Sequence, residues 1–171
     1  MEFLPIKNSE DQYAIKIFKA YCEAFPANER RNDVQFDQLF SNEKAEICII
    51  INDNKEIGYL ILWNLKEVLF VEHFEIFPEF RSQSFGSKIL EKLITENPKV
   101  VLESEPSHLN EIAERRIKFY QRNHFSIISE DYIQPSYGIG KSAIPLFLLA
   151  TFQPESIDKL KLEIYDIVYQ F

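Results

Sequence analysis

The run from His73 to Leu90 constrains the fold of this chain more than any other segment. It has the pattern of a strand, a bend at Pro78, a run of small polar residues and then a helix with one apolar face. Small residues let backbone N–H groups approach a ligand closely, and the start of a helix adds the positive end of its dipole. The segment therefore predicts a cradle for an anion, and a diphosphate suits that arrangement.

Hydrophobic periodicity on either side of this run predicts strands and helices along the whole chain, residues 1–171, with no internal repeat and no linker. The expected strands are residues 2–7, 45–51, 56–63, 67–76, 100–103, 125–132 and 143–152. The expected helices are residues 9–25, 34–40, 85–95, 109–123 and about 155–170. Because the last helix carries an apolar stripe, it docks either on its own domain or on a second copy, which would make a homodimer. This order predicts a single α/β domain.

Charge and hydropathy limit the classes of partner. A net charge of -8 and a pI near 5.0 repel phosphate backbones, which argues against a nucleic-acid partner. The longest apolar stretches, around residues 47–51 and 143–152, are much shorter than the roughly 20 residues of a membrane span, and no leader precedes them. We therefore expect a cytoplasmic protein with no membrane partner. Cys22 and Cys48 lack CxxC spacing and a nearby His, which predicts buried free thiols and no metal site.

The segment Arg81-Ser-Gln-Ser-Phe-Gly86 resembles the acetyl-CoA motif of the GNAT superfamily of N-acetyltransferases, Arg/Gln-x-x-Gly-x-Gly/Ala. Ser84 stands where the family usually has the first glycine, and Ser tolerates positive φ poorly. The resemblance implies the GNAT acyltransferase fold. That fold is a central, mostly antiparallel mixed sheet flanked by helices, whose fourth and fifth strands splay apart.

A second segment downstream is similar to another GNAT signature. Val101-Leu-Glu-Ser-Glu105 corresponds to its strand, and the following helix ends at Tyr120 with a downstream Phe125. His124 replaces the usual glycine after that helix. Two signatures in the family's order imply an enzyme that transfers acetyl from acetyl-CoA to a primary amine of a small molecule or peptide.

The resemblance also assigns residues to the co-substrate. Backbone groups of Phe74 and Ile76 are expected to pair with the pantetheine arm of CoA as an added strand would, because that arm carries amides that need partners. The residues implied in acetyl-CoA binding are Phe74, Glu75, Ile76, Arg81, Ser82, Gln83, Ser84, Phe85, Gly86 and Ser87.

Acetyl transfer needs a neutral amine, yet a lysine-like amine has a pKa of about 10.4 and is mostly protonated at neutral pH. By the resemblance, Tyr120 is the general acid that protonates the departing thiolate, and a strand carboxylate removes the amine proton. Glu103 is the first choice for that base. Glu72 and His73 are rivals, and strand alternation predicts that only one of these two faces the cleft.

The sequence identifies the residues that would contact the acceptor amine less clearly than those that would bind CoA. Glu105 would share the face of Glu103 if the strand continued, and the two would form an acidic wall that attracts a protonated amine. Tyr132, Gln134 and Tyr137 lie between the final strands, where GNAT proteins often build substrate walls, although a turn at Pro135 explains them equally well. Two other functions remain open: an acyl-CoA-binding sensor without turnover, and a protein N-terminal acetyltransferase.

Overall fold

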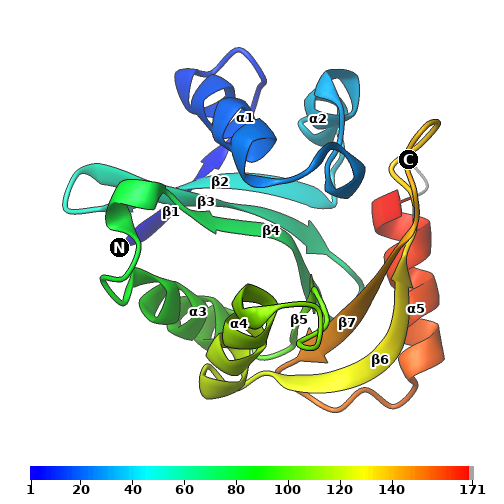
Figure 1. Cartoon of the computed structure of the whole chain (residues 1–171). Coiled ribbons are helices and arrows are strands. Elements are labelled where there is room, and N and C mark those ends of the chain that lie inside the picture. Colours follow the sequence, from blue (N-terminus) through cyan, green and yellow to red (C-terminus); the bar gives the residue numbers. More distant parts are fainter. Residues whose placement is uncertain (170–171) are drawn as a thin grey trace.

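The computed structural model describes residues 1–169, and its strands form one mixed sheet in the order β1-β2-β3-β4-β5-β7-β6 (Figure 1). The strands are β1 (Glu2–Ile6), β2 (Ala45–Asn52), β3 (Lys55–Asn64), β4 (Leu69–Ile76), β5 (Val100–Ser104), β6 (Ser126–Gln134) and β7 (Ile144–Ala150). Neighbouring strands are antiparallel except β4 and β5, which run parallel. The expected mixed, mostly antiparallel sheet is confirmed.

Helices cover both faces of this sheet. They are α1 (Gln12–Ala24), α2 (Asp33–Leu39), α3 (Phe85–Glu96), α4 (Glu111–Arg122) and α5 (Ile157–Ile164), with short 3-10 turns at Ala27–Glu29 and Pro78–Phe80. Side chains cap several of these helices at their first turn. The Asp11 carboxylate accepts from the Tyr13 amide at 2.7 Å before α1, and the Asn32 and Gln35 side chains form a reciprocal capping box on α2.

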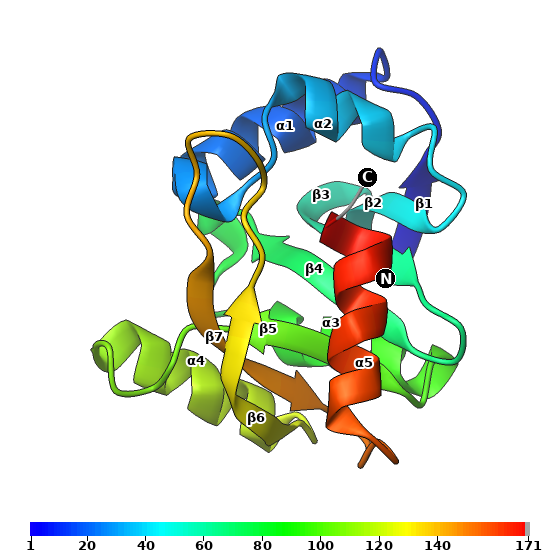
Figure 2. The same cartoon turned by 90° about the vertical axis from the view of Figure 1, so that its right-hand side faces the viewer.

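Two apolar layers result from this arrangement. One contains residues of α1, α2 and α5, such as Ile17, Phe36 and Ile164, packed on one face of the sheet. The other contains residues of α3 and α4, such as Leu90 and Ile117, packed on the opposite face. Figures 1 and 2 show α3 and α4 on the face opposite α1 and α2, and α5 lying across the half formed by β5, β6 and β7.

The sheet splays apart between β4 and β5, as the resemblance implied. These strands pair only where Leu69–Val71 faces Val100–Leu102, although β4 continues to Ile76. Beyond Val71, β4 stays hydrogen-bonded to β3 but has no pairing with β5. The exposed strand edge and the separation of the two sheet halves create the space in which the site lies.

A β-bulge in β4 contradicts the alternation that we expected for Glu72 and His73. Ile61 of β3 faces His73, whereas its neighbour Leu62 faces Val71, so Glu72 is an extra residue in its strand. A bulge of this kind bends the strand and interrupts its alternation. Both side chains therefore lie on the α1 side of the sheet, where they line the same pocket.

The C-terminal helix docks on its own domain. Leu160 and Ile164 of α5 are buried in the core layer of α1 and α2, and a π-helical turn, Tyr165–Tyr169, continues α5 and buries Val168. The expected helix extends to residue 170, which lies outside the described residues. No helix within residues 1–169 has the length and apolar character needed to cross a membrane. Of the two free thiols, Cys48 is buried and Cys22 is only half-buried.

Candidate active site

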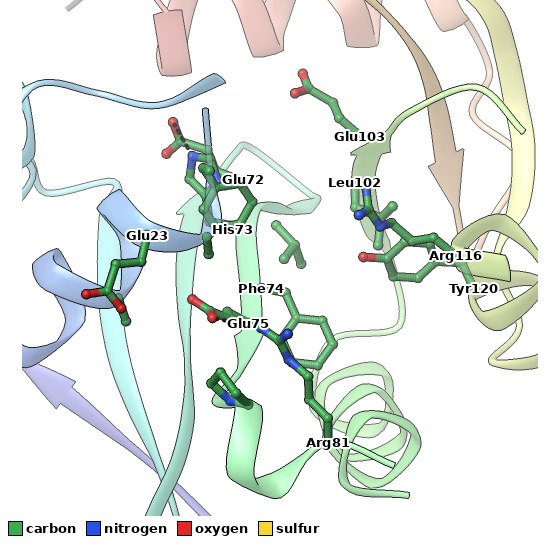
Figure 3. A pocket seen from close by; sticks show the side chains of 15 residues that line it. Glu23, Glu72, His73, Phe74, Glu75, Arg81, Leu102, Glu103, Arg116 and Tyr120 are labelled. Atoms are coloured by element: carbon green, nitrogen blue, oxygen red, sulfur yellow. Dashed lines mark hydrogen bonds and ion pairs between the residues drawn. The ribbon is translucent and has the colours of Figure 1, made fainter. Parts of the chain in front are cut away.

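A pocket of about 530 Å³ opens where the two halves of the sheet separate. Its walls come from the end of α1, from β4, from β5 and from α4 (Figure 3). The charged side chains that line it are Glu23, Glu72, Glu75, Arg81, Glu103 and Arg116. The pocket thus brings together residues that lie far apart in the sequence, with Glu72 and Glu103 on opposite sides of the splay.

Glu103 is held at this pocket by two tyrosines. The Tyr132 hydroxyl donates to its Oε1, and the Tyr169 hydroxyl donates to its Oε2 at 2.8 Å. Burial raises the pKa of Glu103 to about 7, and the charge of Glu72 acts in the same direction, while the two tyrosine hydrogen bonds oppose the rise. A carboxyl group with a pKa near neutrality can both accept and release a proton under physiological conditions.

Glu72 has a different environment because buried Arg31 lies against it. The Arg31 Nη2 atom is 3.0 Å from Glu72 Oε1, and the Tyr137 hydroxyl donates to the same oxygen at 2.8 Å. The Trp63 indole donates to Oε2 at 2.6 Å. Although burial pushes the pKa of Glu72 up, Arg31 and these donors outweigh it and hold the pKa below its usual value. Glu72 is therefore a carboxylate whose oxygens are already engaged by a cation and two donors.

His73 completes this buried cluster. Its Nε2 atom lies 3.2 Å from the Tyr21 hydroxyl and 3.4 Å from the Tyr137 hydroxyl. Burial lowers the pKa of His73 to about 4; the Glu72 charge opposes this and the Arg31 charge adds to it. The imidazole is thus neutral at physiological pH, and its Nε2 atom lies beside one hydroxyl from α1 and one from the segment after β6.

Tyr120 lies where the pocket meets a second one. A groove of about 440 Å³ runs along α3 and α4, and Tyr120 lines both cavities together with Phe74, Arg81 and Arg116. Burial raises the pKa of Tyr120, with partial opposition from Arg116, so the phenol is neutral at physiological pH. Figure 3 shows Tyr120 next to Arg116 on the side of the cleft that carries Glu103.

The groove contains most of the residues expected to bind acetyl-CoA. It is lined by Phe74, Ile76, Arg81, Ser82, Ser84, Phe85, Gly86 and Ser87, with Phe80 and Phe119 beside them. Gln83 and Glu75 do not line it; Gln83 donates to the Glu79 carbonyl at 3.0 Å, and Glu75 faces the other pocket. Phe74 and Ile76 lie on the part of β4 that has left β5, so this edge is available for the pantetheine amides.

The start of α3 has the backbone shape that the motif requires. Ser84 precedes the helix with φ 61°, and Ser82 has φ 62°, both in the left-handed region. The Ser84 side chain makes no capping hydrogen bond, so the first amides of α3 are left for a ligand. A Cβ on Gly86 would lie 3.0 Å from the Phe119 ring, so any larger residue here would require that ring to shift. These features fit a diphosphate group.

The three residues that we expected to form a wall of the acceptor site do not contact the pocket directly. Tyr132, Gln134 and Tyr137 are buried behind Glu103 and Glu72 and do not line the pocket. They act on it indirectly, because Tyr132 and Tyr137 donate to those two glutamates. These residues therefore support the site from behind.

Glu105 does not form an acidic wall with Glu103. Strand β5 ends at Ser104, so the alternation does not reach the next residue. The Glu105 carboxylate instead lies 2.7 Å from Arg116 of α4. This ion pair holds Arg116 at the boundary between pocket and groove, a position that the sequence did not reveal.

Sequence reasoning missed two residues that shape the site. Arg31 follows the first helix in a charged stretch that resembles a solvated loop, yet it is 1% exposed and its Nη2 donates to the Val168 carbonyl at 2.7 Å. Tyr169 lies in the π-helical turn at the end of the last helix, and its hydroxyl contacts Glu103 of β5. For Arg31, the signal in the sequence was the pair of adjacent arginines, Arg30 and Arg31, next to a helix rich in aromatic residues.

The comparisons with known proteins agree with this geometry. A model of the acetyltransferase (GNAT) domain matches residues 43–127, which include the splayed strands and both signatures. A Bacteroides thetaiotaomicron protein described as a "putative acetyltransferase from GNAT family" is 30% identical, with a TM-score of 0.93 over 100% of this chain and 99% of that one. A Bacillus subtilis (strain 168) protein named "Putative acetyltransferase YjbC" is 28% identical over 109 residues, 63% of this chain and 55% of that protein.

This chain therefore spans about half the length of YjbC. A GNAT family acetyltransferase from Elizabethkingia anophelis, solved with acetyl-CoA bound, shares the fold with a TM-score of 0.51 at 19% identity, over 70% of this chain and 82% of that one. The full-length match to the Bacteroides protein and the family match across both signatures lead to one conclusion. The protein is an acyltransferase that belongs to the GNAT acetyltransferase family.

Proposed function

We propose that this protein transfers an acetyl group from acetyl-CoA directly to the primary amine of a small molecule or peptide. The observation that carries the proposal is the position of Glu103, whose pKa is raised to about 7, in the same pocket as the neutral phenol of Tyr120. A base and an acid are thus available on one side of the splay.

Acetyl-CoA supplies the acetyl thioester. Glu103 takes a proton from the ammonium form of the acceptor, directly or through a water, and so produces the nucleophilic amine. The amine nitrogen forms a bond to the carbonyl carbon while the carbon–sulfur bond breaks. Tyr120 gives its proton to the departing sulfur, and the nitrogen loses its second proton, which returns to Tyr120 through solvent. Glu103 releases its own proton to solvent before the next cycle. The products are an N-acetylated amine, CoA with a free thiol and one proton, so atoms and charge balance with the ammonium form of the acceptor.

The groove along α3 is the region to which we assign the co-substrate. The free backbone edge at Phe74 and Ile76 offers partners for two amides, and the amides at the start of α3 offer donors for a diphosphate. Arg81 adds a positive charge on this surface, with its side chain 54% exposed. These contacts orient the thioester toward Tyr120, which lines groove and pocket alike.

The roles of Glu103 and Tyr120 are tested with Glu103→Gln and Tyr120→Phe in an assay of thiol release from acetyl-CoA with a panel of amines. We expect each change to lower kcat by roughly a hundredfold or more, which is the usual contribution of one general acid or base. Calorimetry with CoA should give wild-type affinity for both variants. Glu111→Gln, an exposed position on α4 outside the pocket, is the matched control for the change of charge.

Three outcomes would contradict the proposal. Absence of CoA binding by the folded protein would remove its basis. Binding of CoA without acetylation of any amine would favour the sensor without turnover. Full activity of both variants would show that other groups move the protons.

A further inference from the structure

Arg116 of α4 is a cation that lies where the pocket and the groove meet. It lines both cavities, as Tyr120 does, and the two residues are one helical turn apart on α4. Figure 3 shows the Arg116 guanidinium beside the Tyr120 phenol at the edge of the cleft. Burial raises the pKa of Tyr120 and the charge of Arg116 opposes this rise, which agrees with a short separation. Phenol and guanidinium thus border the same space.

An ion pair keeps the guanidinium in this position. Glu105 Oε2 lies 2.7 Å from Arg116 Nη1, and the two side chains are 29% and 43% exposed. Glu29, in the turn after α1, lies near the pair: burial raises its pKa, the Glu105 charge adds to the rise and the Arg116 charge opposes it. A guanidinium has five N–H donors in a planar fork, so the contact with Glu105 leaves it able to bind a further anionic group.

The rest of the pocket disfavours a negative charge. The carboxylates that line it are Glu23, Glu72, Glu75 and Glu103. Arg81 is already engaged on the β4 side, where its Nη2 lies 3.1 Å from Glu75 Oε1 and its Nε donates to the Ile76 carbonyl at 2.9 Å. For an anion that forms next to Tyr120, Arg116 is therefore the neighbouring cation.

Acetyl transfer forms such a charge on sulfur. As the carbon–sulfur bond breaks, its electron pair moves to the sulfur, which carries negative charge until the proton of Tyr120 has been transferred. With CoA in the groove and Tyr120 as the acid, this sulfur lies at the junction that Arg116 lines. A cation that is already in place stabilises a charge that develops in the transition state and is almost absent from the thioester.

We propose that Arg116 stabilises the negative charge on the sulfur that leaves acetyl-CoA, and so acts beside Tyr120 as a second catalytic group on α4. This rests on the proposed acetyl transfer. Arg116 keeps its protons throughout, so Tyr120 supplies the proton and Arg116 supplies the charge. The same cation favours the thiolate form of CoA after the reaction, which can be measured without turnover.

The test without turnover compares CoA with desulfo-CoA, which lacks the thiol, by calorimetry between neutral pH and about pH 10. A free thiol has a pKa of about 8.5. A cation at the sulfur lowers the pKa of the bound thiol, so CoA should gain affinity over desulfo-CoA as the pH rises. An opposite charge within about 4–6 Å lowers a pKa by about 1–3, and the lower end applies to a partly exposed guanidinium. The gain should therefore be about tenfold smaller in Arg116→Gln.

Arg115→Gln is the matched control, because it removes the same charge from the neighbouring residue of α4. Arg115 is 78% exposed, pairs with Glu111 and lies outside both cavities. Its pH dependence should coincide with that of wild type. An equal gain in wild type and Arg116→Gln would overturn the proposal. So would weaker binding of desulfo-CoA by Arg116→Gln alone, since the arginine would then contact a phosphate or amide of CoA.

Kinetics with acetyl-CoA test the same contact during turnover. Arg116→Gln should lower kcat about tenfold and leave KM for acetyl-CoA within about twofold, and Arg116→Lys, which keeps the charge, should recover part of the loss. A higher KM with unchanged kcat would contradict the assignment to the sulfur.

The two assays separate this proposal from the proposed function. Equal turnover by wild type, Arg116→Gln and Arg115→Gln would remove the role of Arg116 and leave acetyl transfer intact. A preference for CoA over desulfo-CoA that depends on Arg116, without acetylation of any amine, would support the contact and contradict the transfer.

Discussion

Replacing Tyr169 by Phe tests whether the last helix tunes the proposed base. The Tyr169 hydroxyl donates to Glu103 Oε2 at 2.8 Å and accepts from Gln134 at 3.1 Å. Its hydrogen bond favours the charged form of Glu103 and opposes the effect of burial. Removing this donor while keeping the ring therefore disfavours the carboxylate, so the pKa of Glu103 should rise.

The size of the shift follows from the energy of one hydrogen bond. A hydrogen bond to a charged group contributes about 1.5–3 kcal/mol, and one pKa unit corresponds to about 1.4 kcal/mol. The protonated carboxyl also interacts with the tyrosine, and the Tyr132 hydrogen bond remains, so the lower end of this range applies. We expect the pKa of Glu103 to move from about 7 to roughly one unit higher.

The assay is the pH dependence of kcat/KM with one amine. The base acts in its deprotonated form, so a higher pKa moves the acidic limb of the profile to higher pH. In Tyr169→Phe, kcat/KM should be about tenfold below wild type on the acidic side and within about twofold of it above about pH 9. Ionisation of the free amine is the same for both proteins and cancels in their ratio.

Tyr165→Phe is the matched control, because this tyrosine lies in the same π-helical turn and its hydroxyl donates to the Ile133 carbonyl at 2.7 Å. Its profile should coincide with that of wild type. A limb that stays in place in Tyr169→Phe, or that moves to lower pH, would refute the assignment of Glu103 as the titrating base. A uniform loss at every pH would indicate a packing defect instead.

Other predictions concern stability. Arg31→Met leaves the buried carboxylate of Glu72 without its cation, and should lower the free energy of unfolding by about 3–5 kcal/mol in chemical denaturation. Adding Glu72→Leu should recover part of this loss; a purely additive double variant would show that the two charges are not coupled. Ser84→Gly and His124→Gly relieve left-handed backbone at φ 61° and 70°, and each should raise the melting temperature through a gain of about 0.5–1 kcal/mol. A lower melting temperature would mean that these side chains stabilise the fold.

The order of the elements and the outline of the CoA groove could be predicted because they depend on local patterns. Periodicity gave the strands and helices to within a few residues, and the motif from Arg81 to Gly86 gave the turn before α3. The presence of Ser84 in place of the usual glycine does not alter the shape of this turn, since the serine adopts the left-handed conformation that the motif usually assigns to glycine. The family resemblance supplied the splay between β4 and β5, which no local pattern encodes.

The interior of the site could not be predicted, because it depends on contacts between distant segments. The bulge at Glu72 arises from how β4 pairs with β3, and alternation alone gives the wrong face. Arg31 has the sequence context of a solvated loop until the end of the last helix closes over it. Tyr132 and Tyr137 were expected to contact substrate, but their neighbours in the sequence do not show that Glu103 and Glu72 lie in front of them.

The two glutamates at the splay show how environment divides their roles. The Glu72 side chain is buried and Glu103 is half-buried, and the loss of solvent alone would raise the pKa of each. Arg31 supplies a full positive charge to Glu72, whereas the described residues give Glu103 two neutral hydroxyls and the negative charge of Glu72 lies nearby. One carboxylate is consequently fixed in its charged form and organises the core of the site, while the other titrates near neutral pH. Because the charge of Glu72 contributes to the raised pKa of Glu103, and Arg31 keeps Glu72 charged, removing the charge of Arg31 should change the pKa of Glu103 as well as the stability of the fold.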